Sequence, residues 1–180
     1  ITPEVPGPLS VSASHNNVES GPDNLRQAID GNPYTRWSTF TPQRPGMWFR
    51  LDLGQLMTIS HLRLDNSLSP NDYPRGYVVR LSADGTNWTT AAENHANGGP
   101  LDVTFTPQLA RYIHIDQTGS DSFYWWSIHE IVIGADPAGG WTVSASHNNV
   151  LSGADNLRFA LDGNPQTRWS SREPQKPGMW

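Results

Sequence analysis

A long-period internal repeat constrains this chain more than any other feature of its sequence. The segment VSASHNNV occurs at residues 11–18 and again at 143–150. The match continues without a gap, so that residues 10–48 and 142–180 agree at 29 of 39 positions with an offset of 132 residues. Solenoid repeats have units of roughly 20–50 residues, whereas about 130 residues is the size of one compact domain. The repeat therefore predicts two sister domains in tandem.

The repeat also predicts the domain boundaries. Residues 1–8 form a Pro-rich linker, residues 9–134 a complete module, and residues 135–141, which contain ADPAGG, a second linker. Residues 142–180 are then the N-terminal part of a second, truncated copy. Tandem copies of a small module gain apparent affinity by raising the effective concentration of binding sites. The arrangement therefore favours binding over catalysis.

The composition narrows the class of protein. The chain has 11 Arg and one Lys, which form no basic run, and its formal net charge is −5. Both observations argue against nucleic-acid binding. The abundance of Gly (16), Pro (15) and Trp (8), with only 16% charged residues, is typical of a loop-rich, all-β extracellular domain. No apolar stretch approaches the roughly 20 residues of a membrane span. The absence of cysteine excludes disulfides.

Strand patterns dominate residues 48–134. Alternating apolar residues or turn signals predict strands at residues 48–54, 58–66, 76–82, 101–107, 110–117 and 127–134. The Asp-Gly pair in SADGTNW is a strong signal for a hairpin turn. Only residues 23–30 have helical spacing, with Leu25, Ala28 and Ile29 on one face. We therefore expect a β-sandwich with one short helix.

Several motifs in register resemble a known family. The segments AIDGNPYTRWS, WFRLDLGQLMTISHLRL, YPRGYVVRLSADGTNW, ARYIHI and WWSIHEIVI occur in the order and at the spacing of the discoidin, or factor V/VIII type C, domain. The chain is most similar to its carbohydrate-binding branch, the family 32 modules attached to secreted bacterial glycoside hydrolases such as chitosanases and glucanases. The resemblance implies a jelly-roll of two antiparallel sheets.

A metal site is the first candidate. Asp30, Asn32 and Thr35 lie in a Gly-containing turn after the helix, and hard cations such as Ca²⁺ prefer carboxylate, hydroxyl and carbonyl oxygens. Taken alone, DGN is also a common turn, so Asp30 and Glu130 have a simple alternative as turn and surface residues. The resemblance implies a structural Ca²⁺, held by the carbonyls of Gln27, Asn32, Thr35 and His129 and the side chains of Asp30, Thr35 and Glu130.

A glycan site is the second candidate. Sugar sites combine an aromatic platform with planar hydrogen-bonding groups, and Arg36 offers such a group beside the apolar Trp37. The resemblance places the site on loops at one end of the sandwich. The candidates on those loops are Glu19, Arg36, Asn66, Asp72, Tyr73, Tyr124 and Trp125. The alternative for each aromatic is ordinary packing, which is the role predicted for Trp37, Trp48, Trp88 and Trp126. If Trp37 points into the core, alternation places Arg36 and Ser38 together on the opposite face. Ser38 stands where galactose-binding relatives often carry His.

No motif indicates catalysis. The chain lacks HExxH, GxSxG and a cysteine nucleophile. The hypothesis is a non-catalytic module that targets an attached secreted polysaccharide-degrading enzyme to chitosan, β-glucan or a galactoside. Two alternatives remain open: an adhesion or membrane-binding discoidin module, and a structural spacer. The copies differ at predicted loop positions, for example Glu19 and Leu151, which suggests different ligand preferences.

Overall fold

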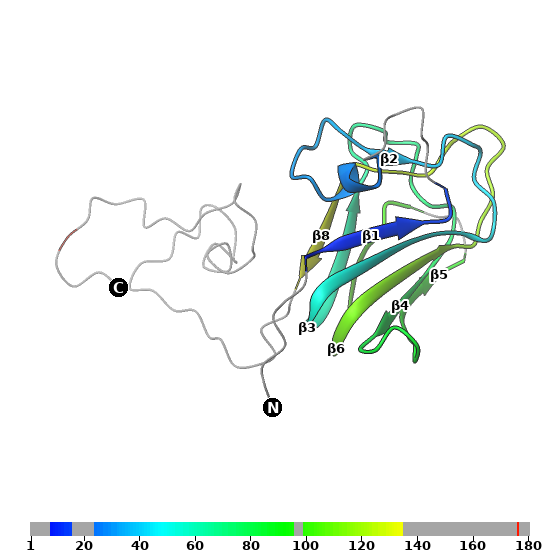
Figure 1. Ribbon diagram of the computed structural model, residues 1–180. Coiled ribbons are helices and arrows are strands. Elements are labelled where there is room, and N and C mark those ends of the chain that lie inside the picture. Colours follow the sequence, from blue (N-terminus) through cyan, green and yellow to red (C-terminus); the bar gives the residue numbers. More distant parts are fainter. Residues whose placement is uncertain (1–7, 16–23, 96–98, 135–175, 177–180) are drawn as a thin grey trace.

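The computed structural model describes residues 8–15, 24–95, 99–134 and 176. The second copy at 142–180 therefore lies outside the described residues, apart from Lys176. The described chain is almost entirely β, as predicted, and its elements can be followed in Figure 1. In chain order the elements are β1 (Ser10–Ala13), η2 (Asn24–Ala28), β2 (Trp37–Ser38), β3 (Met47–Asp65), β4 (Tyr77–Ser82), β5 (Thr89–Asn94), β6 (Asp102–Gln117), β7 (Ser127–Ile128) and β8 (Glu130–Gly134).

Two long strands, β3 and β6, build both layers of the sandwich. They pair antiparallel, with register shifts between Asp52 and Met57 and between Ile59 and His61. On one side of these irregularities the strand order is β1-β3-β6-β4-β5, and on the other side β8 pairs with β3. The sequence predicted two strands where β3 runs and two where β6 runs. A bulge lets one strand bend from one layer into the other. The two strands predicted over β3 are therefore a single strand, and the same holds for the two predicted over β6.

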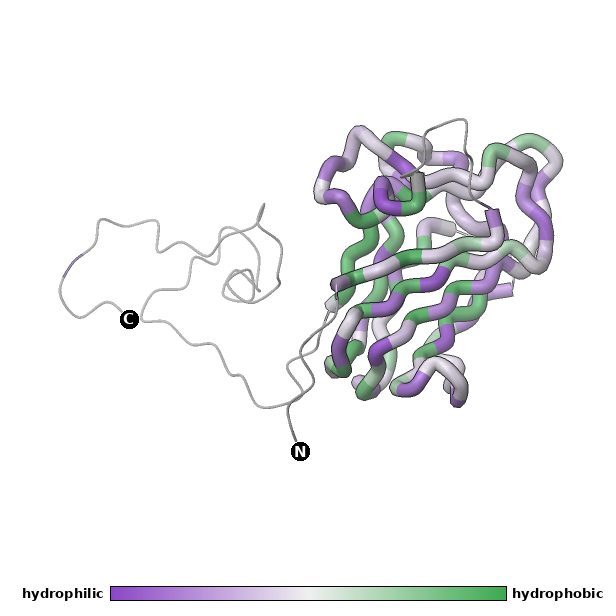
Figure 2. The backbone as a smooth tube through the Cα atoms, in the orientation of Figure 1, coloured by the Kyte–Doolittle hydropathy of each residue, from purple (hydrophilic) through white to green (hydrophobic). Residues whose placement is uncertain are grey.

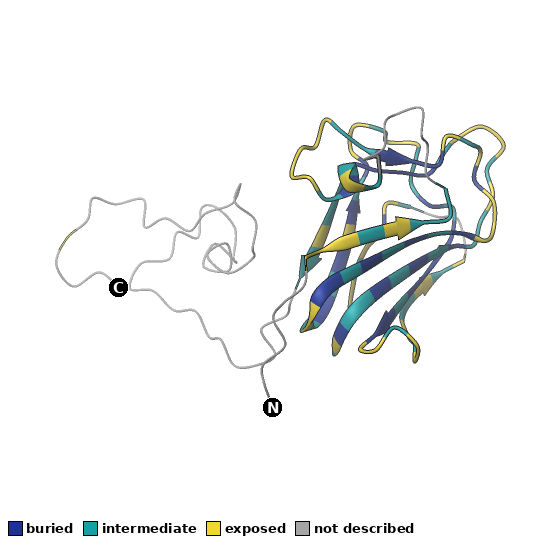
Figure 3. Ribbon diagram, in the orientation of Figure 1, coloured by how far each residue is buried: buried dark blue, intermediate teal, exposed yellow. Residues whose placement is uncertain are grey.

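The core lies between the layers. Alternate residues of β3 point inward, including Met47, Phe49 and Leu51, which are fully buried. Trp37 packs edge-on against Phe49 and Trp126, with ring centroids 4.8 and 5.2 Å apart. The alternation is visible in the hydropathy of the tube in Figure 2 and in the burial of the ribbon in Figure 3. The predicted packing role of Trp37 and Trp126 is therefore confirmed.

The predicted helix exists but is a short 3₁₀ helix, η2, rather than a longer α-helix. Ala28 is fully buried, and Leu25 and Ile29 pack against the core cluster. The chain turns at Gly31, whose φ of 76° lies in the region that glycine adopts without strain. The helix thus positions the turn that follows it against the sandwich.

The hairpin of β4 and β5 is confirmed. The two strands pair antiparallel from Tyr77 with Asn94 to Leu81 with Thr89. The carboxylate of Asp84 accepts hydrogen bonds from the backbone N–H groups of Thr86 and Asn87, both at 2.8 Å. These bonds hold the pKa of Asp84 well below its usual range. The turn is therefore ordered by its own side chains.

Candidate functional site

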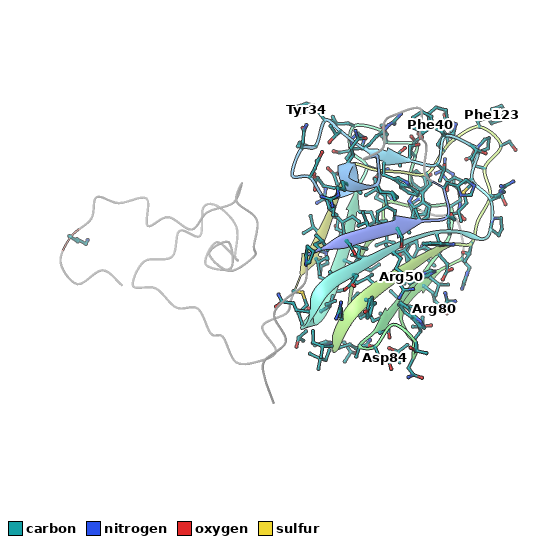
Figure 4. All side chains as sticks on the ribbon, viewed as in Figure 1. Tyr34, Phe40, Arg50, Arg80, Asp84 and Phe123 are labelled. Atoms are coloured by element: carbon teal, nitrogen blue, oxygen red, sulfur yellow. The ribbon has the colours of Figure 1, made fainter. Side chains whose placement is uncertain are left out.

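Three loops meet at one end of the sandwich, beside the small sheet formed by β2 and β7. They comprise residues 39–46, 66–76 and 118–126, and the labelled Phe40 and Phe123 mark this end in Figure 4. Tyr34, from the turn before β2, lies at the same end. Gln117, at the end of β6, leads into the third loop. We call this region the loop end.

Gln43 joins the loops from inside. Its amide nitrogen donates to the carbonyls of Tyr73 (2.9 Å) and Trp125 (2.6 Å). Its amide oxygen accepts from the backbone N–H of Arg75 (3.1 Å) and from the side chain of Gln117 (2.7 Å). Gln43 is only 2% exposed. A buried amide with all of its partners satisfied holds a unique loop arrangement, and this residue was not predicted.

Arg36 and Asp72 are brought together, as the prediction of a shared site requires. Nη1 of Arg36 lies 3.2 Å from Oδ2 of Asp72 and also donates to the hydroxyl of Ser69. The same Oδ2 accepts from the hydroxyl of Ser127 at 2.7 Å. Asp72 is therefore fixed by two elements distant in sequence, and it orients a guanidinium whose side chain is one-third exposed. Ser38, expected on the same face as Arg36, is instead fully buried.

An aromatic pair lies next to this arginine. The ring of Trp125 stacks on Phe40, with centroids 4.7 Å apart and an interplanar angle of 25°. The guanidinium carbon of Arg36 is 5.9 Å from the Trp125 ring centroid. Tyr124, which precedes Trp125 in the chain, is 43% exposed. Planar donors beside a flat apolar surface are the two elements that hold a pyranose ring. Phe40 was not predicted as a site residue.

Arg75 orders the aromatic side chains of the second and third loops. Its guanidinium carbon lies 4.0 Å from the centroid of Tyr73 and 5.4 Å from that of Tyr124. Its Nε donates to Asp121 at 2.8 Å. Backbone N–H groups of Tyr124 and Phe123, together with Arg75, hold the pKa of Asp121 below its usual range. Arg75 therefore fixes Tyr73 and Tyr124 in place.

The remaining predicted glycan residues are distributed differently. Asn66 is buried, and its amide donates to the carbonyl of Ser69 at 3.4 Å, so it shapes the base of the second loop. Glu19 lies outside the described residues. Two aromatic side chains outside the predicted glycan set, those of Tyr34 and Phe123, are each 83% exposed at the loop end. An exposed aromatic side chain has no local sequence signature, which explains why they were missed.

The predicted metal turn places oxygens close together. Asp30 accepts hydrogen bonds from the backbone N–H of Asn32 (2.9 Å) and from the Thr35 hydroxyl (2.8 Å). That hydroxyl also contacts the carbonyl of Asn32 at 2.9 Å. Burial and the nearby carboxyl of Asp30 raise the pKa of Glu130 to about 7. Gln27 lies half-buried in η2 just before the turn.

His129 is buried and joins the turn to the second loop. Its Nδ1 lies 2.9 Å from the carbonyl of Pro33, and its Nε2 lies 3.0 Å from the hydroxyl of Ser69. Oε1 of Glu130 is buried and has no hydrogen-bond partner among the described residues. In that part of the chain, no three His, Cys, Asp or Glu side chains gather into a metal-binding group. A cation here would therefore need carbonyl and hydroxyl oxygens besides the two carboxylates.

Comparison with known proteins identifies the class. Residues 10–131 match the F5/8 type C domain, and the chain belongs to this family. No curated protein matches the chain. Within the part of the chain that the structure describes, no helix has the length and apolarity needed to cross a membrane.

Several solved structures that resemble the chain are carbohydrate-binding modules. One is a pectin-binding module, 30% identical, with a TM-score of 0.54, covering 72% of this chain and 91% of its own. Another is chitosan-binding module 2 of a chitosanase/glucanase from Paenibacillus sp. IK-5, solved with chitotriose, with 26% identity, a TM-score of 0.59 and coverages of 69% and 94%. A third is the family 32 module of NanJ from C. perfringens with galactose, with 25% identity, a TM-score of 0.57 and coverages of 69% and 92%.

Proposed function

We propose that the described domain is a non-catalytic carbohydrate-binding module that targets an attached, secreted polysaccharide-degrading enzyme to its glycan. The observation that carries the proposal is the meeting of Arg36, Asp72 and Trp125 at the loop end. Arg36 would donate to sugar hydroxyls, Asp72 would accept from them, and the ring of Trp125 would contact the apolar face of a pyranose. The relatives that bind pectin, chitotriose and galactose support carbohydrate as the ligand class.

The glycans proposed are chitosan, β-glucan and galactosides. The Arg36–Asp72 pair leaves no surplus charge at the centre of the site, which suits a neutral sugar or an amino sugar. Ser38 is buried and cannot contact a ligand as a surface histidine would. An open site of this kind leaves much of the sugar in water, so single-site affinity is weak and tandem copies compensate for it.

The test is binding of the 180-residue chain to a panel of chitosan oligosaccharides, β-glucans and galactosides, measured by calorimetry. Arg36→Ala should lower the affinity for the bound glycan about tenfold or more, since a charge-assisted hydrogen bond is lost. Arg63→Ala is the matched control, because Arg63 pairs with Asp65 on β3 in the other layer. Equal affinities in the two variants, or no binding to the whole panel, would contradict the proposal.

A structural calcium ion is part of the proposal. Asp30, Thr35 and Glu130 would supply side-chain oxygens, and Gln27, Asn32, Thr35 and His129 would supply carbonyls. The support is chemical: among the described residues a buried Glu130 oxygen lacks a hydrogen-bond partner, and burial together with the nearby carboxyl of Asp30 raises the pKa of Glu130. Calcium takes six to eight oxygen ligands and would neutralise this pair. When bound, the ion would tie the turn after η2 to the start of β8.

One observation favours a different function. Tyr34 and Phe123 are 83% exposed at the loop end, and Leu68 is 54% exposed on the second loop. Exposed apolar side chains on adjacent loops mark interaction sites, including membrane surfaces. The same end of the domain would then bind lipid as an adhesion or membrane-binding module. Co-sedimentation with phosphatidylserine vesicles, compared with a Phe123→Ser variant, separates this function from glycan binding.

A further inference from the structure

The outer surface of the larger sheet layer carries a second cluster of aromatic and cationic side chains. Strand alternation buries one set of residues in β3, β6 and β4 and turns their neighbours outward. Register places Arg50 opposite His114, and His114 opposite Arg80. We call this surface the sheet face. Its members are Trp48, Arg50, Asp52, Arg80, Trp88, Arg111, Tyr112, His114 and Asp116. Figure 4 shows Arg50 and Arg80 well away from Tyr34, Phe40 and Phe123.

Aromatic rings form a strip across this face. Trp48 stacks on the ring of His114, with centroids 5.4 Å apart and an interplanar angle of 26°. Trp88, from the loop before β5, meets His114 edge-on at 5.6 Å and lies 6.5 Å from Tyr112. All four residues are half-buried. Trp48 and Trp88, expected to act in packing, thus lie outside the core, where their rings also offer flat apolar surface.

Arg50 differs from the other arginines of the face. Its guanidinium carbon lies 4.9 Å from the Trp88 centroid and 5.1 Å from the Tyr112 centroid, which orients the group by cation–π contacts. Arg80 pairs with Asp116, and Arg111 pairs with Asp52 at 2.7 Å. Among the described residues, Arg50 has no ion-pair partner. The surplus positive charge of this strip is therefore on a rigidly held, partly desolvated guanidinium.

We propose that the sheet face is a second carbohydrate-binding surface, separate from the loop end, and that it takes a linear acidic polysaccharide of the polyuronate class. A pyranose ring would lie against Trp48 or Trp88, and a sugar carboxylate would accept hydrogen bonds from Arg50. One surplus charge matches one carboxylate per sugar ring. Nucleic acid would need several unpaired cations to neutralise its phosphates, and this face has one.

The electrostatic setting of His114 is consistent with this role. Burial, followed by the charges of Arg50 and Arg80, lowers the pKa of His114, although Asp116 lies 3.2 Å from its Nε2. The imidazole is therefore neutral near pH 7 and serves as a stacking ring. The positive charge offered to a ligand then comes from Arg50.

The test uses the 180-residue chain and two polymers that share one backbone. Polygalacturonate carries the carboxylates, and its fully methyl-esterified form does not. We expect polygalacturonate to bind at low salt about tenfold more tightly than the ester, and Arg50→Gln to weaken its binding about tenfold. Arg63→Gln, on the other layer, should bind polygalacturonate like the unchanged chain, and Arg36→Ala reports separately on the loop end. Equal binding by Arg50→Gln, weakening only in Arg36→Ala, or no binding to the unchanged chain would overturn the proposal.

A second measurement keeps the test decisive if Arg50→Gln perturbs the fold. The indole N–H signals of Trp48, Trp88 and Trp125 are assigned by single Trp→Phe substitutions and followed by nuclear magnetic resonance during polygalacturonate titration. We expect the Trp48 and Trp88 signals to shift and that of Trp125 to stay unchanged. Shifts confined to Trp125 would place the polymer at the loop end and overturn the proposal. Failure of the loop-end function would leave these expectations unchanged.

Discussion

Two arginines of this domain, Arg36 at the loop end and Arg50 on the sheet face, each lie near a tryptophan ring but are held by different means. Arg36 is 5.9 Å from the Trp125 centroid and is oriented by the Asp72 carboxylate. Arg50 is 4.9 Å from the Trp88 centroid and has no ion-pair partner among the described residues. The charge of Arg36 is therefore balanced by the Asp72 carboxylate, whereas no ion pair among the described residues balances the charge of Arg50.

The supporting structure also differs. At the loop end, the buried amide of Gln43 joins loops that are up to 82 residues apart in the chain. On the sheet face, the backbone register of three strands places the side chains, and the hairpin turn adds Trp88. A site built on strands depends on regular geometry, whereas a site built on loops depends on a few satisfied polar groups. Perturbing each support separately should break one site and leave the other.

The largest effect is expected from Gln43→Leu. The substitution leaves the carbonyls of Tyr73 and Trp125 without their side-chain donor, and it should cost about 3 kcal/mol of unfolding free energy, because each unsatisfied buried group costs about 1–3 kcal/mol. Urea unfolding measures the loss. Loop-end glycan binding should disappear while polygalacturonate binding persists. Gln108→Leu is the control, since Gln108 is half-buried and accepts a hydrogen bond from Thr89. Loss of both binding activities together would contradict the separation of the two sites.

Calcium should stabilise the folded domain by tying the turn after η2 to the start of β8. At a free concentration of 100 times the dissociation constant, the ion should add about 2.7 kcal/mol to the unfolding free energy. Calorimetric melting in calcium and in chelator measures this difference. Glu130→Gln should abolish the gain, whereas Glu93→Gln, an exposed carboxylate on β5, should retain it. A gain of equal size in both variants would exclude the proposed ligand set.

A pair of glycine substitutions tests the sheet face. Gly85 and Gly46 have φ angles of 77° and 90°, so alanine at either position should cost about 1 kcal/mol. Only at Gly85 would the new Cβ approach Arg50 Nη2 (3.1 Å) and Tyr112 (3.2 Å). We therefore expect similar losses of thermal stability and a selective loss of polygalacturonate affinity in Gly85→Ala. Equal affinities in both variants would show that Arg50 tolerates displacement.

The smallest effect concerns pH. Because folding lowers the pKa of His114, the unfolded chain binds more protons than the folded chain between the folded pKa and about 6.5. The contribution of His114 to stability is therefore complete above about pH 6.5 and decreases as the pH falls below it. Comparing the stability of the unchanged chain with that of His114→Gln at pH 7.5 and pH 5.5 isolates this term. If the stability difference between the two chains were the same at both pH values, the nearby Asp116 carboxylate would be offsetting the effect of burial on the pKa of His114.

Much of the fold was predictable because it follows from local patterns. Alternation in WFRLDLG and ARYIHI predicted strands with one buried face, and the Asp-Gly turn predicted the β4–β5 hairpin. That residues 47–65 form one continuous strand was not predictable. The local sequence pattern indicates two strands, and only the bulged pairing with β6 shows that the chain continues as one. The 3₁₀ form of η2 also depends on packing, as Ala28 is buried against the sandwich.

For the candidate sites, residue types could be nominated from the chain but their grouping could not. Arg36, Asp72 and Trp125 were proposed together, and they do lie together, but Phe40, Gln43 and Arg75 were absent from the prediction. The two faces of every strand are distinguishable by hydrophobicity alone, because only one of them is excluded from water. Whether a polar or aromatic side chain on the other face meets a partner depends on strand register and loop packing, and these bring together residues 30 to 89 positions apart.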